Sequence, residues 1–225
     1  MSGIEFEPWE PEESVGKLWH SYVSGLGAPA HHADAAATLE DVSGRLGVLF
    51  RGLGGARDVE VKAAPPQQQS NRLSWRRSLG HRAERLARPS FDGEALRLPE
   101  RIAVFTEYEA NVALYIWLAA SAAFSRPAPA EADPLRADIR AVQQAQAMTR
   151  ATLAECPGLR STYAALVART RALRPDHALP STEAAMEAAI RNLLGGAPVQ
   201  DPRALRIAAA VRGETSDLTE FTAPR

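Results

Sequence analysis

Residues 98–124 hold the most continuous apolar pattern in the chain. The second half, residues 112–124, is apolar on nearly every side, whereas an amphipathic surface helix shows a single apolar stripe. A membrane span needs about 20 such residues, so this shorter run predicts a buried central helix of a soluble domain, over residues 106–124. Thr106 and Glu109 have the spacing of a capping box, which predicts where the helix begins.

Apolar residues at helical spacing predict further helices packed around this one. They are expected at about residues 11–24, 34–52, 134–155, 159–173, 181–194 and 202–211. Asp133-Pro134 and Asp201-Pro202 each combine a capping side chain with a first-turn proline. Gly44 and Gly47 lie inside a predicted helix, where glycine is unfavourable, and this suggests that another helix crosses closely there.

A small β element is expected between residues 58 and 105. Residues 58–63 alternate between apolar and polar side chains, and residues 95–98 and 101–105 form extended pieces around a proline. Residues 65–70 have the composition of a loop. A β-hairpin or a three-stranded sheet would therefore cap the helical body.

The sequence thus predicts a mainly α fold, a helical bundle around the buried helix 106–124. We expect one helical domain over residues 1–212, followed by a flexible tail or the start of a linker at 213–225. The chain has 225 residues, 45% of them hydrophobic and 24% charged, which permits a real core and argues against wholesale disorder. No apolar leader segment follows the start, so a cytoplasmic protein is the expectation.

Recognisable catalytic motifs are missing from the sequence: it has no GxxxxGK[ST], no GxGxxG after a strand and no HExxH. We therefore expect no catalytic residue and no cofactor. His31, His32 and Asp34 could ligate a metal, and a small metal-binding or iron-handling helical protein is the alternative, although adjacent histidines at a helix start are more often solvated. The single cysteine, Cys156, excludes an internal disulfide. It stands beside a proline and is interpreted as a small buried side chain.

One strongly basic stretch, residues 72–88, contains a tryptophan among its arginines. Arginine and tryptophan anchor protein interfaces, and they also contact phosphates and stack on bases. A solvated face is the other reading, and the net charge of −1 argues against nucleic acid. The acidic, aromatic N-terminus is a second candidate arm, unless Trp9 folds back as a lid on the core. The candidate partner-binding residues are Arg72, Trp75, Arg76, Arg77, Arg82, Arg85, Phe6 and Trp9.

Five blocks of sequence, spread over about residues 6–195, resemble the N-terminal region of the NorD/CbbO family. The blocks are EPWEPEESVGKLWH at 7–20, RLGVLFRGLGG at 45–55, DGEALRLPERIAVF at 92–105, LYIWLAA at 114–120 and CPGLRSTYAALV at 156–167. NorD is a nitric oxide reductase activation protein, and CbbO is its relative in Rubisco activation. The first block is more similar to NorD.

This resemblance implies an adaptor. Family members carry a von Willebrand factor A domain with a DxSxS metal-ion-dependent adhesion site, and they work with a MoxR-type AAA+ ATPase ring of the NorQ/CbbQ kind. For NorD the client is nitric oxide reductase, whose non-haem iron centre needs maturation. This sequence has no DxSxS, so it looks like an N-terminal domain without that module, and no metal ligand is carried over.

From the resemblance we expect a non-catalytic adaptor domain that contacts the ATPase ring, with a client metalloenzyme as second partner. A CbbO-type adaptor of a Rubisco activase is the alternative. Neither nucleic-acid binding nor direct membrane insertion is expected.

Overall fold

The structure is a computed structural model, and we describe residues 32–64, 66–68, 85–87, 90–91, 94–126, 131–174, 179–215 and 217–222. Within these residues the fold is mainly α, as the sequence predicts. The helices are η1 (Ala33–Ala35), α2 (Leu39–Gly52), α3 (Tyr108–Ala122), α4 (Pro134–Glu155), η2 (Pro157–Leu159), α5 (Arg160–Ala172), α6 (Ser181–Leu193) and α7 (Pro202–Arg212). The strands are β1 (Ala37–Thr38), β2 (Glu60–Ala63), β3 (Pro66–Gln68), β4 (Arg85–Ala87), β5 (Ser90–Phe91), β6 (Ala95–Leu98) and β7 (Arg101–Ile102).

Helix α3 is the predicted buried central helix, and only its first two residues are exposed. It begins at Tyr108 rather than at Thr106, and the predicted capping box is wrong: Glu107 occupies the N-cap position without a capping side-chain hydrogen bond. The reason is the buried Asn111 side chain, which donates hydrogen bonds to the carbonyls of Phe105 and Glu107. These bonds hold the preceding turn outside the helix.

Helix α2 packs along α3 through a stripe of buried apolar residues: Leu39, Val42, Leu46 and Phe50. The predicted start at Asp34 is wrong, because residues 37–38 pair with β7 as strand β1 before the helix begins. A capping box of Thr38 and Asp41 marks the true start.

The predicted close crossing at two glycines of α2 is also wrong. A Cβ atom at Gly44 would meet nothing within 4 Å, and the nearest atoms to one at Gly47 would belong to the Arg51 side chain of the same helix. Neither glycine is therefore needed for contact with another helix.

A three-stranded sheet exists, as predicted, in the order β2-β6-β5, with β2 and β6 parallel and β5 and β6 antiparallel. Its third strand is β5, whereas the predicted extended piece at 101–105 contributes β7, which pairs with β1 instead. The loop predicted at 65–70 is wrong for residues 66–68, because these form strand β3, which pairs antiparallel with β4. Polar composition says little about pairing with a distant segment, since the backbone provides the hydrogen bonds.

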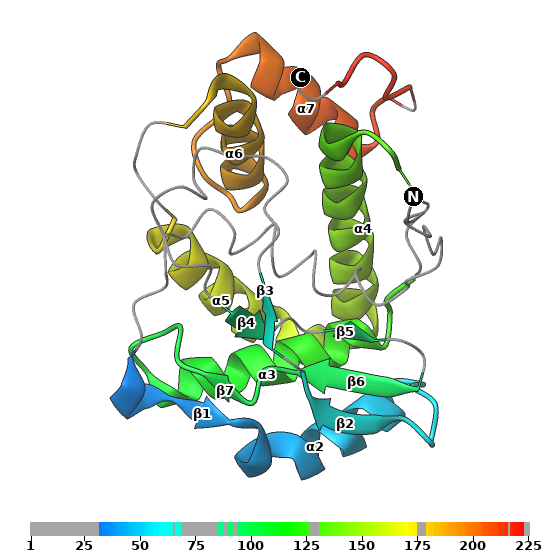
Figure 1. The fold of residues 1–225 in the computed structure, drawn as a ribbon, viewed down its shortest axis with the longest axis vertical. Coiled ribbons are helices and arrows are strands. Elements are labelled where there is room, and N and C mark those ends of the chain that lie inside the picture. Colours follow the sequence, from blue (N-terminus) through cyan, green and yellow to red (C-terminus); the bar gives the residue numbers. More distant parts are fainter. Residues whose placement is uncertain are drawn as a thin grey trace, which may run out of the picture.

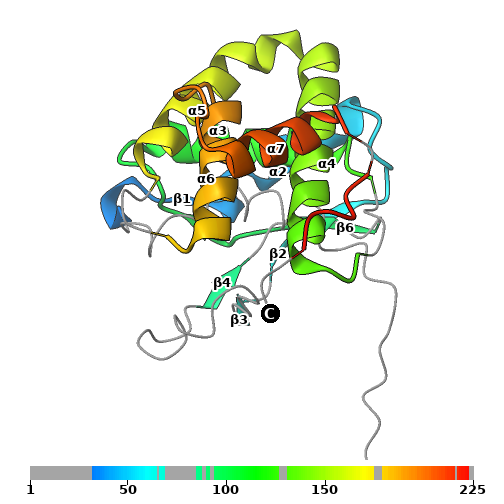
Figure 2. The ribbon, with the colours of Figure 1, turned by 90° about the horizontal axis from the view of Figure 1, so that it is seen from above.

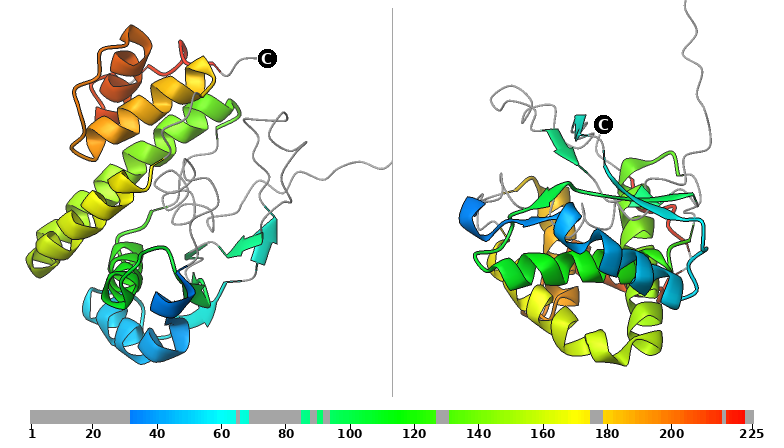
Figure 3. Two further views of the ribbon diagram at one scale, coloured as in Figure 1. Left: turned by 90° about the vertical axis from the view of Figure 1, so that its left-hand side faces the viewer. Right: turned by 90° about the horizontal axis from the view of Figure 1, so that it is seen from below.

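A second hydrophobic cluster lies at the other end of the molecule, between α4, α6 and α7. Figure 1 and Figure 3 place α2, α3 and strands β1, β2, β6 and β7 together, away from α6 and α7. Figure 2 shows α7 crossing between α6 and α4.

Leu218 and Phe221 are buried in this cluster, although they fall in the segment predicted as a tail. The domain boundary at residue 212 stays a prediction. Among the described helices, none has the length and apolar character required to traverse a bilayer.

Candidate binding cleft

A cleft of about 490 Å³ opens between α4, α5, α6 and the end of α7. Its volume falls in the range of ligand-binding pockets, about 300–1,000 Å³. The lining residues are Val142, Ala145, Gln146, Thr149, Arg150, Tyr163, Ile190, Leu193, Leu194, Arg212 and Glu214. Six of these are apolar or aromatic, and several belong to the second hydrophobic cluster, so the cleft is a hollow at the edge of that core.

Two hydrogen bonds between side chains and distant carbonyls fix the helices around the cleft. Gln143 of α4 donates its Nε2 to the carbonyl of Ala210 in α7, at 2.7 Å. Arg171 of α5 donates to the carbonyl of Gly195, just after α6, also at 2.7 Å. Each bond joins elements that are far apart in sequence. The bonds therefore fix the positions of the cleft walls relative to one another.

A buried ion cluster joins the end of α5 to α6. The side chain of Arg174 is 1% exposed and contacts both carboxylate oxygens of Glu187, at 2.6 and 2.5 Å. Arg191, one turn along α6, contacts Glu187 at 2.8 Å. Burial opposes ionisation of Glu187, but the hydrogen bonds from the two guanidinium groups prevail and lower its pKa. With its charges paired in this way, the cluster is a structural clamp.

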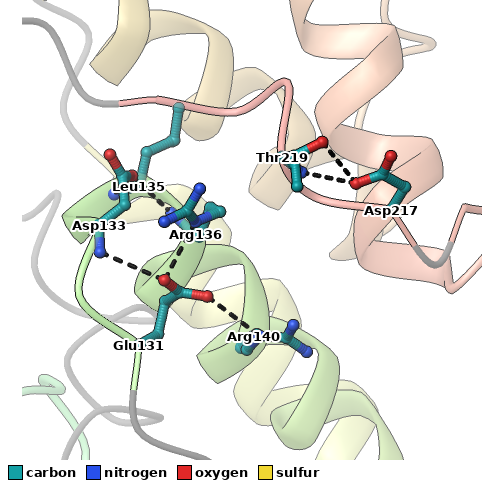
Figure 4. Close-up of polar contacts among 7 residues, drawn as sticks. All are labelled: Glu131, Asp133, Leu135, Arg136, Arg140, Asp217 and Thr219. Carbon is teal, nitrogen blue, oxygen red and sulfur yellow. Dashed lines mark hydrogen bonds and ion pairs between the residues drawn. The ribbon is translucent and has the colours of Figure 1, made fainter.

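The start of α4, whose middle turns line the cleft, is fixed by a second polar cluster (Figure 4). Asp133 accepts hydrogen bonds from the backbone N–H groups of Leu135 and Arg136 as the predicted N-cap. Glu131 contacts the guanidinium groups of Arg136, at 3.0 Å, and Arg140, at 3.5 Å. A hydrogen bond from the backbone N–H of Asp133 lowers the pKa of Glu131, and the hydrogen bond from Arg136 lowers it further. The carboxylate therefore stays ionised and ties down the first turns of α4.

The edge of the cleft is polar and carries two arginines. Arg150 donates to the Oε1 atom of Gln146 at 3.4 Å, while the buried Nε2 of Gln146 has no acceptor among the described residues. Arg212 contacts Glu214 at 2.5 Å, and this contact lowers the pKa of the Glu214 carboxyl. Such a site offers apolar contact, a buried hydrogen-bond donor and a cationic rim.

Most of the predicted partner-binding residues lie outside the described part of the chain, so their role stays a prediction. These are Phe6, Trp9, Arg72, Trp75, Arg76, Arg77 and Arg82. For Arg85 the structure describes the backbone, which pairs in β4 with Gln68 of β3.

The metal alternative also stays untested, because His31 lies outside the described residues. His32 precedes η1 and donates its backbone N–H to the carbonyl of Ala103, and Asp34 lies within η1. In the described ranges, no three histidine, cysteine or acidic side chains gather as a metal site would require. Cys156 is half-buried, and its pKa is raised by desolvation and by Glu155. A raised pKa disfavours the reactive thiolate.

The sequence did not reveal the cleft, although it predicted that some of its walls face inward. The helical spacing of Val142, Ile190, Leu193 and Leu194 predicts that these side chains point into the core. The polar edge, in contrast, depends on how α4 lies against α6 and the end of α7, and no local pattern encodes that arrangement.

The known proteins that match this chain and carry a family name all belong to one family. No family model matches the chain, and no solved structure matches it. Protein NorD of Brucella suis biovar 1 is 36% identical over 188 residues, which cover 82% of this chain and 30% of that protein. Protein NorD of Stutzerimonas stutzeri is 34% identical over 200 residues, or 88% of this chain and 31% of that protein.

An uncharacterized protein of Pseudomonas aeruginosa is 37% identical over 186 residues, or 82% of this chain and 29% of the relative. The chain thus spans about 30% of the length of the curated relatives it matches. Because proteins named NorD share more than a third of their aligned residues with over four fifths of this chain, the chain belongs to the NorD family.

Proposed function

We propose that this chain is a non-catalytic adaptor domain of the nitric oxide reductase activation system. It binds a MoxR-type AAA+ ATPase ring and couples the ring to maturation of nitric oxide reductase, by assisting insertion of its non-haem iron. The observation that carries the proposal is the identity to proteins named NorD over most of the chain. The curated matches that bear a family name are NorD proteins, which favours nitric oxide reductase over Rubisco as the client.

The helical body supports this role because it can present binding surfaces without moving. A buried ion pair of Arg174 and Glu187 joins the end of α5 to α6, and side-chain hydrogen bonds tie α4 to α7 and α5 to the segment after α6. A rigid body of this kind transmits force from a ring to a client. The proposed contacts to the ATPase are the arginine stretch 72–88 and the acidic segment that contains Phe6 and Trp9.

The test is binding of the purified chain to its cognate MoxR-type ATPase, measured by pull-down and by co-elution in the presence of ATP. We expect the wild type to bind, and we expect Arg76→Glu with Arg77→Glu to weaken binding by roughly tenfold or more, since reversing charges at an interface adds repulsion. The double variant Arg45→Glu with Arg57→Glu is the matched control. It makes the same change of charge at two exposed positions of the described structure.

Failure of the wild type to bind would overturn the ATPase as partner. Equal loss of binding in the two double variants would show a general effect of net charge and remove the arginine stretch from the proposal. Unchanged binding of the variant with Arg76→Glu and Arg77→Glu would also remove the arginine stretch from the proposal.

A further inference from the structure

The cleft between α4, α5, α6 and the end of α7 combines an apolar floor with a polar edge that carries two arginines. Its floor is formed by side chains of the second hydrophobic cluster, with Val142 and Leu194 nearly inaccessible to solvent. A hollow with a mainly apolar lining is the kind of place where an apolar group of a ligand or partner binds. The volume of about 490 Å³ accommodates large side chains, and not only solvent.

Gln146 supplies a second and independent observation. Its Nε2 atom is buried and has no hydrogen-bond acceptor among the described residues, whereas its Oε1 atom accepts from Arg150. A buried donor without an acceptor is costly, and it calls for a partner. A backbone carbonyl of a bound segment supplies such an acceptor when the Gln146 side chain turns toward the cleft.

The charges at the rim of the cleft favour an occupant of opposite charge. Arg150 and Arg212 both line the cleft, and Glu214, the one carboxylate among the described lining residues, is already paired with Arg212. The rim therefore carries a net positive charge, which favours a carboxylate on the bound partner. Two guanidinium groups beside an apolar floor fit one or two carboxylates better than the regular row of phosphates of a nucleic acid.

We propose that this cleft binds a segment of a partner protein in which a large apolar side chain stands next to a carboxylate. The apolar side chain enters the floor, a backbone carbonyl of the segment accepts from Gln146, and the carboxylate contacts Arg150. The inference depends on the cleft alone and is independent of the ATPase assignment.

The probes are three short fluorescein-labelled peptides, tested on the full chain by fluorescence anisotropy. The first has a central leucine–tryptophan pair flanked by glutamates, the second has lysines in place of the glutamates, and the third has alanines in place of the central pair. We expect the first peptide to bind at least roughly tenfold tighter than the other two. Equal binding of all three would overturn the proposal.

Three variants locate the binding site. Arg150→Glu should weaken binding of the acidic peptide and strengthen binding of the lysine peptide. Arg45→Glu, on α2, should change the binding of neither peptide. Gln146→Leu should weaken the acidic peptide without lowering the melting temperature, because it removes a buried donor that lacks an acceptor. This last variant separates binding from folding, since a purely structural glutamine would show no effect on the peptide.

Unchanged binding of the acidic peptide to both cleft variants would overturn the proposal. Displacement of the peptide by a single-stranded oligonucleotide would also overturn it, in favour of a nucleic-acid occupant. So would concentration-dependent dimerisation that the cleft variants abolish while no peptide binds, because the occupant would then be a second copy of the chain.

Discussion

Asn111 illustrates how one polar residue shapes the first hydrophobic cluster. The residue is 0% exposed, and its Oδ1 accepts hydrogen bonds from the backbone N–H groups of Val104, at 3.1 Å, and Phe105, at 3.0 Å. Its Nδ2 donates to the carbonyls of Ala35, Phe105 and Glu107. A single side chain thus hydrogen-bonds backbone groups from η1 to the start of α3, although the carbonyl of Glu107 also accepts from the backbone N–H groups of Ala110 and Asn111.

Replacing this residue should be costly for that reason. We expect Asn111→Ala to lower the free energy of unfolding by about 3 kcal/mol or more, because several buried backbone groups lose their partners together. Urea unfolding followed by circular dichroism measures the change. Asn192→Ala is the control: its side chain makes one exposed hydrogen bond of 3.4 Å, and it should cost less than about 1 kcal/mol. Similar losses in the two variants would contradict the role assigned to Asn111.

At the scale of elements, the contact between α5 and α6 depends on the ionisation of Glu187. Its pKa is lowered from the ordinary value of 4.5 by its two arginine partners. The stability that this group contributes is therefore present above about pH 4.5, and it is lost as the pH falls through the lower pKa of the folded state.

Glu187→Gln should be destabilised by roughly 3 kcal/mol at neutral pH, since the buried Arg174 then lacks the negative charge of Glu187 beside it. The difference from wild type should shrink as the pH falls from about 4.5 through the lower pKa of the folded state, because protonation of the carboxylate then removes its charge in wild type as well. Free energies of unfolding measured between pH 3 and 7 provide the test. Glu183→Gln, on the same helix, is the control and should follow the wild-type curve. A constant gap between Glu187→Gln and wild type would show that charge is not the cause.

The helices and strands show which structural features can be predicted from the local sequence and which cannot. Asp133 and Asp201 cap α4 and α7 as predicted, because a capping side chain acts on the N–H groups next to it. Strands β1 and β3 were missed, because each is defined by pairing with a segment far along the chain. The same reason explains the cleft: its apolar walls were predictable from helical spacing, whereas the meeting of Gln146 and Arg150 with Arg212 follows from tertiary packing.

At the scale of the whole molecule, α5 and α4 connect two hydrophobic clusters. Leu166 of α5 is buried in the cluster of α2 and α3, while its neighbour Val167 packs against the cluster of α4, α6 and α7. The end of α3 reaches α4 through Phe124, which packs against Ala145 and Met148. The cleft lies on the side of the second cluster, so its shape depends on that cluster and on the residues that complete it.

Phe221 is one of those residues, since it is 6% exposed and lies beyond α7 in the second cluster. We expect Phe221→Ala to cost about 3 kcal/mol, in keeping with large-to-small changes in a core. Hydrogen exchange followed by mass spectrometry should show faster exchange in α6 and α7, with α2 and α3 nearly unchanged, because proteins open locally in cooperative units. Leu205→Ala is the control: Leu205 lies on α7 but is 46% exposed, and its loss should leave exchange nearly as in wild type. If Phe221→Ala accelerated exchange equally in α2 and α3, the two clusters would form one cooperative unit, and the cleft would depend on the whole fold instead of its own end of it.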